Sequence, residues 1–325
     1  MYLSFFKILN RQQPSVVDGF LILLIIKTKF RYSLALNILE TYIVPPLKAP
    51  IRLSDLRAGT FSLIVSRKAF TKLIKANLVH VNNKKSTTAT PLLGGEIITV
   101  FRDQTPSNKP SIKIAFDVIY EDEYLAIINK PPGVEVSGNK RYTIANALDK
   151  ALKKSNQEDA LLRPEPIHRL DYPTSGCLLI GKTSTSVMKL NRAFQEKKID
   201  KVYYAITIGK QKASGTITSP LDGKSCISHF EVIDTVASIK YKALNLVKLI
   251  PATGRKHQLR KHLAAIQNPI MGDNQYGTDG NKGMGNGLYL HAYSIKFIHP
   301  ATALTISEHI KLPKKFTRIF KQIRL

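Results

Sequence analysis

Strongly apolar residues occur in this chain only in short segments, and this limits the possible folds more than any other feature. Strand-like apolar segments cover residues 124–129, 178–180, 202–208 and 244–250. The longest strongly apolar run, residues 19–26, lies between Asp18 and Lys27. A membrane-spanning helix needs about 20 apolar residues, so the pattern indicates a soluble, sheet-containing fold without transmembrane spans.

Helical spacing of apolar residues is confined to a few segments. It occurs in residues 67–76, 143–154 and 186–197, and near the C-terminus at Phe316, Ile319, Phe320 and Ile323. Combined with the strand-like segments, these helices predict an α/β or α+β fold after residue 114. We expect the basic C-terminal helix to dock on the core, and binding to a membrane surface is the alternative.

The chain is strongly basic. It contains 49 Lys and Arg residues against 23 Asp and Glu, a formal net charge of +26. Such a surface suits a polyanion, either nucleic acid or an anionic membrane, although a generally basic proteome is the alternative explanation. Only two cysteines occur, Cys177 and Cys226, too few for a disulfide framework or a cysteine-rich zinc site. We therefore expect a reducing compartment, the cytoplasm of a bacterial-type cell.

Proline-rich and polar stretches divide the chain into four parts. Residues 1–50 end in Pro45-Pro46 and Pro50, and they form an extension, a targeting segment or the product of a start site assigned too early. A signal peptide is disfavoured because no small-residue cleavage site follows the apolar run. Residues 51–103 form a compact unit, residues 104–113 a linker, and residues 114–325 the largest domain.

The unit formed by residues 51–103 has clear local signals. Ser66 is a suitable N-cap for a helix over residues 67–76, with Lys68, Lys72 and Lys75 on its polar face. Asn77 can end this helix in the left-handed conformation, and Asn82-Asn83 can form a turn after a strand over residues 78–81. Gly94-Gly95 precedes a last strand over residues 96–100.

Three segments of the larger domain carry side chains suited to chemistry. Asp171 follows His168 and Arg169 on an irregular loop, where an isolated Asp is most often a turn residue or an ion-pair partner. Residues 253–263 are dense in cations, which indicates either a solvated basic helix or an arginine that faces a buried carboxylate. Residues 201–205 place Tyr203 and Tyr204 on opposite faces of a strand.

Together these segments resemble the RluA-type family of RNA pseudouridine synthases. The resemblance covers roughly residues 115–325, in the order and spacing of the family. The matching segments are Asn129-Lys130-Pro131-Pro132-Gly133, residues 168–176 with Gly181-Lys182-Thr183, residues 201–205, residues 253–262, Asn268-Pro269-Ile270, Gly272-Asp273 with Tyr276-Gly277, and Leu290-His291-Ala292. The resemblance implies an α+β catalytic domain with a mixed, mainly antiparallel sheet.

The resemblance also implies an activity and its residues. Asp171 corresponds to the required carboxylate, Arg260 to the arginine that pairs with it and keeps it deprotonated, and Tyr203 to a tyrosine beside the target base. Whether the carboxylate attacks the ribose, removes a proton from it or adds to the base stays open. Arg169 corresponds to the residue that fills the gap left by a flipped nucleotide. The other expected substrate-binding residues are His168, Lys130, Arg255 and His257.

The implied reaction isomerises uridine in RNA to pseudouridine. No electrons are exchanged and no group is imported, so we expect neither a cofactor nor a metal ion. The glycine-rich stretch 280–287 lacks the Gly-Lys-Ser/Thr ending of a phosphate-binding loop and is expected to be a surface loop. The expected partner is structured RNA, either ribosomal or transfer RNA, and we expect a monomer without stable membrane association.

Residues 51–103 resemble an S4-like RNA-binding domain. The matching segments are Ser66-Arg67, Leu73-Ile74, residues 79–82 and residues 94–97. Asn77 and Asn83 replace the usual glycines, and both positions are expected to need positive φ. The expected RNA-binding residues are Arg67, Lys68, Lys72, Lys75, Lys84 and Lys85. A small α/β domain of this kind favours large-subunit ribosomal RNA as the substrate.

Three other functions are compatible with parts of the sequence. A non-catalytic RNA-binding protein, such as a ribosome-assembly factor, could share the fold. A base-excising glycosylase could also use an Asp, but it would release free uracil. A basic membrane-surface protein would explain only the net charge and the C-terminal helix.

Overall fold

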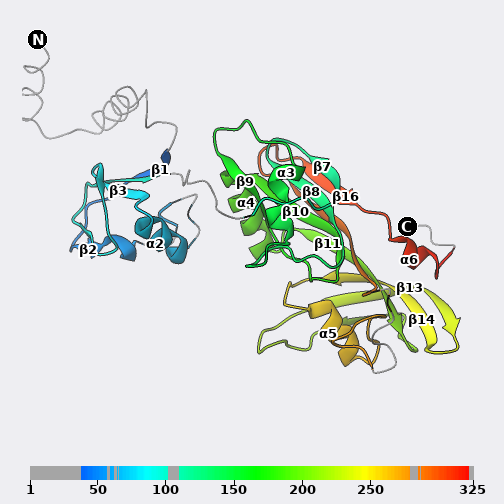
Figure 1. The fold of residues 1–325 in the computed structure, drawn as a ribbon. Coiled ribbons are helices and arrows are strands. Elements are labelled where there is room, and N and C mark those ends of the chain that lie inside the picture. The colour runs from blue at the N-terminus through cyan, green and yellow to red at the C-terminus, as the bar shows by residue number, and fades with distance from the viewer. Residues whose placement is uncertain are drawn as a thin grey trace, which may run out of the picture. The chain divides into compact units, whose positions relative to one another are not determined.

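The computed structural model describes residues 38–321 except 57–58, 62–63, 65, 102–109, 279–284 and 286. The chain forms two compact units, Met1–Thr105 and Pro106–Leu325, which are described separately (Figure 1). The segments outside the described residues include most of the expected extension, most of the expected linker, and nearly all of the glycine-rich stretch 280–287.

The smaller unit is built on a four-stranded antiparallel sheet with the order β1-β6-β3-β4. Its elements are β1 (Ile38–Ile43), β2 (Ile51–Arg52), η2 (Leu53–Asp55), α2 (Arg67–Lys75), β3 (Val79–Val81), β4 (Lys84–Lys85), β5 (Pro91–Leu92) and β6 (Ile97–Phe101). Strand β1 lies within the segment that the sequence assigned to an extension. The prolines after it do not end a domain, because Val44 continues the pairing with the backbone of Glu96 and Gly95.

Helix α2 forms where the sequence predicts it. The Ser66 side chain accepts a hydrogen bond from the backbone N–H of Ala69, a cap that contributes about 1 kcal/mol. Phe70 and Ile74 are buried in the core of the unit. The predicted positive φ at Asn77 and Asn83 is confirmed, with values of 58° and 64°.

The larger unit contains a ten-stranded sheet with the path β12-β13-β14-β11-β15-β10-β8-β7, to which β16 and β9 are added beside β15 and β10. The strands are β7 (Asp117–Glu121), β8 (Leu125–Lys130), β9 (Ala160–Pro166), β10 (Ser175–Thr183), β11 (Asp200–Ile208), β12 (Ser214–Ile217), β13 (Ser228–Ser238), β14 (Lys242–Pro251), β15 (Leu290–Ile298) and β16 (Thr305–His309). The expected α+β fold with a mixed, mainly antiparallel sheet is confirmed, since β10 and β15 pair in parallel, whereas the pairs β8–β10, β11–β14 and β13–β14 are antiparallel.

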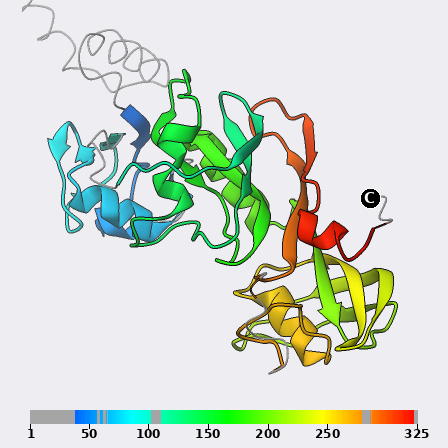
Figure 2. The same ribbon diagram turned by 45° about the vertical axis from the view of Figure 1, so that its right-hand side comes forward.

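The helices of the larger unit lie at two ends of this sheet (Figures 1 and 2). Helices α3 (Leu148–Ala151) and α4 (Ser184–Gln195) lie near β8–β10, whereas α5 (Gln258–Ala265) lies beside β13 and β14. Strands β8 and β10 are buried on both faces, because their alternate residues enter two different hydrophobic clusters. A third cluster fills the end that carries α5.

The two ends of the sheet meet where β10 approaches β15. Their parallel pairing covers only Ser175–Gly176 against His291–Ala292. An added Cβ at Gly176 would lie 2.1 Å from the carbonyl oxygen of Ala292, and the φ of Gly176 is +116°. Glycine is therefore required here by both the close approach and the backbone conformation.

One predicted helix is wrong in its extent. Residues 143–154 form only a short 3-10 turn, η3 (Ile144–Asn146), followed by the single turn of α3. The backbone N–H groups of Lys153 and Asn156 donate to the carboxylates of Glu121 and Glu123 instead of continuing a helix. Side chains from the β7–β8 region thus end this helix, which local spacing cannot reveal.

The C-terminal segment docks on the core, as its apolar stripe predicts. Phe316 in α6 (Lys314–Thr317) and Phe320 after it are 0% and 1% exposed. Ile323 lies outside the described residues. Among the helices that the structure describes, none has the length and apolarity to cross a bilayer.

We predict that Gly176→Ala lowers the free energy of unfolding by at least about 2 kcal/mol, because the new methyl group meets the Ala292 carbonyl in a strained backbone. Gly223→Ala is the matched control, since Gly223 also has positive φ but nothing within 4 Å of an added Cβ. It should cost about 1 kcal/mol. Urea unfolding of both variants measures the difference, and equal losses would contradict the close-approach argument.

Candidate active site

Asp171 lies on the loop between β9 and β10, directly before the junction with β15. Its carbonyl accepts a hydrogen bond from the backbone N–H of Thr174, which closes a turn. Gly176 then allows β10 to approach β15, so the turn is anchored on the sheet. The Asp171 side chain is 16% exposed, so the carboxylate is largely enclosed yet still reaches the surface.

Lys130, at the end of β8, holds this loop from beneath. Its side chain is fully buried, and Nζ donates to the carbonyl oxygens of Pro131, Tyr172 and Thr174 at 2.8, 3.3 and 2.8 Å. Burial lowers the pKa of Lys130 to about 8, although the nearby Asp171 carboxylate opposes this shift. The expected substrate-binding residue Lys130 thus supports the loop that carries Asp171 and has no exposed surface.

His168 is also turned inward. Its Nε2 atom accepts a hydrogen bond of 3.1 Å from the backbone N–H of Leu179, and its ring packs against Phe194 with centroids 4.9 Å apart. Burial, with a contribution from Lys201, lowers the pKa of His168 to about 3, so the ring is neutral. These contacts fix the loop to β10 through His168, and they occupy the nitrogen of its neutral ring that can accept a hydrogen bond.

Arg260 approaches Asp171 from helix α5. Its Nη1 atom lies 3.5 Å from Asp171 Oδ2, which brings the two expected partners together. The tighter contact is with Asp273, to which Nε and Nη2 donate at 2.7 and 2.8 Å. Arg260 and Asp273 are 6% and 1% exposed, so this bidentate pair is buried.

His257 lies on the other side of Asp171. It precedes α5 with φ of 55°, and its Nε2 atom is 3.8 Å from Asp171 Oδ1. Its Nδ1 atom shares a hydrogen bond of 2.9 Å with the Tyr276 hydroxyl. Burial lowers the pKa of His257, and the carboxylate of Asp171 only partly offsets this effect.

Tyr203 reaches the same region from β11. The predicted separation of the two tyrosines is confirmed, since Tyr204 stacks edge-on against Tyr293 with centroids 5.0 Å apart, while Tyr203 lies close enough to Asp171 for the two side chains to interact electrostatically. The β11–β15 ladder shifts register beside Tyr203, a local irregularity that often re-aims a side chain. Burial and the charge of Asp171 raise the pKa of Tyr203, so its hydroxyl stays protonated.

Two expected substrate-binding residues lie at the surface. Arg169 and Arg255 are both exposed. Arg169 lies two residues before Asp171, and Arg255 lies two residues before His257. Tyr172, directly after Asp171, is an exposed aromatic residue that sequence reasoning did not single out. Their exposure leaves them free to meet a large substrate, which the buried residues cannot do.

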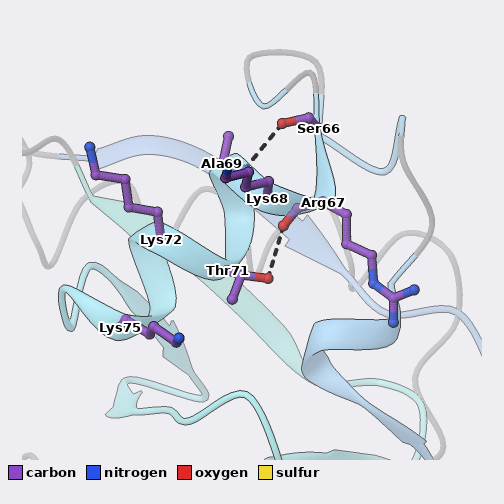
Figure 3. A pocket seen from close by; sticks show the side chains of 7 residues that line it. All are labelled: Ser66, Arg67, Lys68, Ala69, Thr71, Lys72 and Lys75. Carbon is purple, nitrogen blue, oxygen red and sulfur yellow. Dashed lines mark hydrogen bonds between the residues drawn. The ribbon is translucent and has the colours of Figure 1, made fainter.

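A hollow lies along α2 in the smaller unit and is lined by Ser66, Arg67, Lys68, Ala69, Thr71, Lys72 and Lys75 (Figure 3). Lys68, Lys72 and Lys75 are exposed, as are Lys84 and Lys85 on β4. Arg67 differs from them, because its guanidinium pairs with Asp55 and donates to the carbonyl of Ser54. It stabilises η2, whereas the lysines present their charges to solvent.

A buried polar network attaches α5 to the sheet. Gln258 donates to Ser228 Oγ at 2.8 Å, and Ser228 Oγ lies 2.9 Å from Nδ1 of His262. The Nε2 atom of His262 lies 3.0 Å from the carbonyl of Ser219 and 3.2 Å from Cys226 Sγ. These bonds fix the helix that carries Arg260. Within the part of the chain that the structure describes, no three His, Cys, Asp or Glu side chains form a possible metal site.

Sequence reasoning missed Asp273 and Tyr276 as members of this site. Both lie in the segment 272–277, which matched the family without an assigned role. The sequence signal was the glycine directly before Asp273. The structure explains this glycine, because its φ is +76° and an added Cβ would lie 2.1 Å from the Gly287 carbonyl oxygen. A glycine under such a constraint marks a backbone position that delivers the next side chain accurately.

Comparisons with known proteins agree with this geometry. The family described as RNA pseudouridylate synthase matches residues 124–265. Ribosomal large subunit pseudouridine synthase C of Rickettsia bellii is 30% identical over 287 residues, covering 79% of this chain and 93% of the relative. Ribosomal large subunit pseudouridine synthase D of Buchnera aphidicola is 33% identical over 292 residues, covering 80% and 90%.

The fold is also shared with a solved structure, human RNA pseudouridylate synthase domain containing 4. The TM-score is 0.52 at 24% identity, and the match covers 63% of this chain and 91% of the human one. The two relatives span most of this chain, and the matched family includes the segments that carry Asp171, Tyr203 and Arg260. The chain therefore belongs to the RluA-type family of RNA pseudouridine synthases, isomerases that convert uridine in RNA to pseudouridine.

Proposed function

We propose that this enzyme modifies uridines of large-subunit ribosomal RNA, with Asp171 as the catalytic carboxylate. The observation that carries the assignment of Asp171 is its position between Arg260, at 3.5 Å, and His257, at 3.8 Å, with Tyr203 on β11 near enough to interact with its charge. The names of the relatives from Rickettsia bellii and Buchnera aphidicola support ribosomal RNA as the substrate. The net charge of +26 suits a large polyanion.

The proposed chemistry needs only side chains. The bond between N1 of the base and C1′ of the ribose breaks, the base turns, and a bond forms between C5 and C1′. The proton on C5 leaves, and N1 gains a proton, so atoms and electrons balance within the nucleotide. Asp171 assists the cleavage at the ribose or the base, and Arg260 stabilises the charged carboxylate beside it.

Tyr203 and the exposed arginine have separate proposed roles. The Tyr203 hydroxyl remains protonated, so in the resting enzyme it donates a hydrogen bond beside the base instead of acting as a base itself. Arg169 is exposed on the loop of Asp171 and fills the gap that the flipped uridine leaves. Flipping costs a few kcal/mol, which favours uridines in loops.

The smaller unit is proposed to be an S4-like RNA-binding domain. Lys68, Lys72 and Lys75 lie on one exposed face of α2 and would contact phosphates. Lys84 and Lys85 add charge on β4, whereas Arg67 is engaged with Asp55. One chain supplies Asp171, Tyr203 and Arg260, which suits a monomer, and its two free, buried cysteines suit the cytoplasm.

The substrate and the role of Asp171 are tested together by mapping pseudouridines in ribosomal and transfer RNA of cells with and without the gene. We expect positions in large-subunit ribosomal RNA to be lost on deletion. Wild type and the control Asp117→Asn, at an exposed carboxylate on β7, should restore them, and Asp171→Asn should not. Purified Asp171→Asn should still bind RNA.

Each alternative gives a different result in this experiment. Losses confined to transfer RNA would replace the proposed substrate. Restoration by Asp171→Asn would remove Asp171 from the chemistry. Release of free uracil by the purified enzyme would indicate a glycosylase, because an isomerase leaves the mass of the strand unchanged.

The lysine face of α2 is tested by the salt dependence of RNA binding. Changing Lys68, Lys72 and Lys75 together to Gln should reduce the slope of log Kd against log salt by about 2, since fewer counterions are released. A charge-matched control changes Lys210, Lys212 and Lys224, three exposed lysines of the larger unit. Equal slopes for both triple variants would contradict phosphate contact by α2.

The support of the Asp171 loop is tested by Lys130→Met. Removing the ammonium group takes a donor from three carbonyl oxygens, of which that of Tyr172 keeps the backbone N–H of Gly133. This should lower the free energy of unfolding by about 1–3 kcal/mol and also lower kcat. Lys182→Met is the control, because Lys182 is equally buried but bonds to Glu121 and the Asp122 carbonyl. It should lower stability at unchanged kcat. An equal loss of kcat in both variants would count against a specific role of Lys130.

A further inference from the structure

Arg260 is shared unequally between two carboxylates. Asp273 receives its Nε and Nη2 donors at 2.7 and 2.8 Å, whereas Asp171 faces its Nη1 atom at 3.5 Å. The first pair has the geometry of a charge-assisted bidentate contact, and the second is longer than an ordinary hydrogen bond. The guanidinium is therefore held by Asp273 and presented to Asp171.

Asp273 is itself held by the backbone. Its Oδ1 atom accepts hydrogen bonds from the backbone N–H groups of Gln275 and Tyr276, both at 3.0 Å. Burial by itself would raise the pKa of Asp273, but the bonds from Arg260 and from these backbone groups lower it overall. Asp273 is only 1% exposed, so its carboxylate has no direct path to an RNA substrate.

Tyr276 connects this anchor back to Asp171. The guanidinium carbon of Arg260 lies 5.0 Å from the Tyr276 ring centroid, a cation–π contact that limits rotation of the guanidinium. The Tyr276 hydroxyl bonds to His257, whose other nitrogen is 3.8 Å from Asp171. A closed chain of contacts, which passes through the Arg260 guanidinium, thus links Asp171, Arg260, Asp273, Tyr276 and His257.

We propose that Asp273 is a positioning residue for the pseudouridine synthase reaction, acting through Arg260 on Asp171. It fixes the direction of the Nη1 atom, and it balances the charge of the guanidinium so that Asp171 is held only loosely. A loosely held carboxylate keeps oxygen lone pairs available for the substrate, whereas a bidentate pair with Arg260 would occupy them. This inference rests on the proposed catalytic role of Asp171.

The charge balance at Asp171 has a measurable consequence. The charged and titratable groups that interact electrostatically with its carboxylate are Arg260 and His257 from the α5 region, Lys130 from β8 and Tyr203 from β11. Replacing Asp273 by Asn removes a negative charge from this environment. The Arg260 guanidinium is then no longer held by a charged partner at Asp273, so it turns toward Asp171 and occupies the oxygens that the substrate needs.

The test compares purified Asp273→Asn with wild type on an RNA fragment that the wild type modifies. We expect kcat to fall about 10- to 100-fold, with KM and RNA affinity within about twofold. Asp122→Asn is the control, because Asp122 is also an anchored carboxylate, bonded to Tyr120, His299 and backbone N–H groups at the β7–β8 turn. It should lower thermal stability at unchanged kcat.

A double-mutant comparison keeps the inference testable if Asp273→Asn folds poorly. Arg260→Gln with Asp273→Asn removes both charges of the buried pair, so no unpaired charge is left inside. If Asp273 acts through Arg260, the double variant should have the kcat of Arg260→Gln alone within about threefold. A further drop beyond that, or an Asp273→Asn variant whose KM rises as much as its kcat falls, would overturn the positioning role. Activity of Asp171→Asn would instead refute the proposed function itself.

Discussion

The close approach of β10 to β15 is the constraint on which the candidate active site depends. Only two residue pairs join these strands in parallel, and the absence of a side chain at Gly176 lets the backbone meet Ala292. Asp171 enters from the loop before β10, while Arg260 enters from α5, which packs beside β13 at the other end of the sheet. Tyr203 on β11 pairs with Ala292 on β15, so it lies beside the same junction. The junction therefore brings side chains from distant parts of the chain within reach of one carboxylate.

The polar and charged side chains at this junction are of two kinds, those that are enclosed by the protein and those that reach the surface. Lys130 and Asp273 are buried, His168 is half-buried, and all three bond to backbone or to Arg260, so they hold the loop and the guanidinium in place. Asp171 keeps longer contacts and partial exposure. A charged group that is already surrounded by fixed partners needs little reorganisation during a reaction, which is how preorganised sites stabilise developing charge. The residues that support Asp171 thus hold the proposed catalytic carboxylate in place.

Local features of the fold could be predicted from the sequence, and long-range ones could not. Ser66 and Asn77 act on neighbours in the chain, so the start and end of α2 followed from residue type alone. The shortening of the helix over residues 143–154 depends on Glu121 and Glu123, which lie far away in sequence. Strand β1 was not predicted for a related reason. The prolines after it resemble a domain boundary, whereas its pairing with β6 makes it part of the smaller unit.

The candidate site shows the same limit at the level of single side chains. Motif resemblance gathered Asp171, Tyr203 and Arg260, and the structure brings these three together. The motif resemblance could not show which carboxylate binds Arg260 more closely, because distance and burial in the folded chain decide between the two. A motif records which residue types occur together, whereas the strength of each contact depends on geometry. The buried pair between Arg260 and Asp273 is therefore a physical property that only the three-dimensional arrangement reveals.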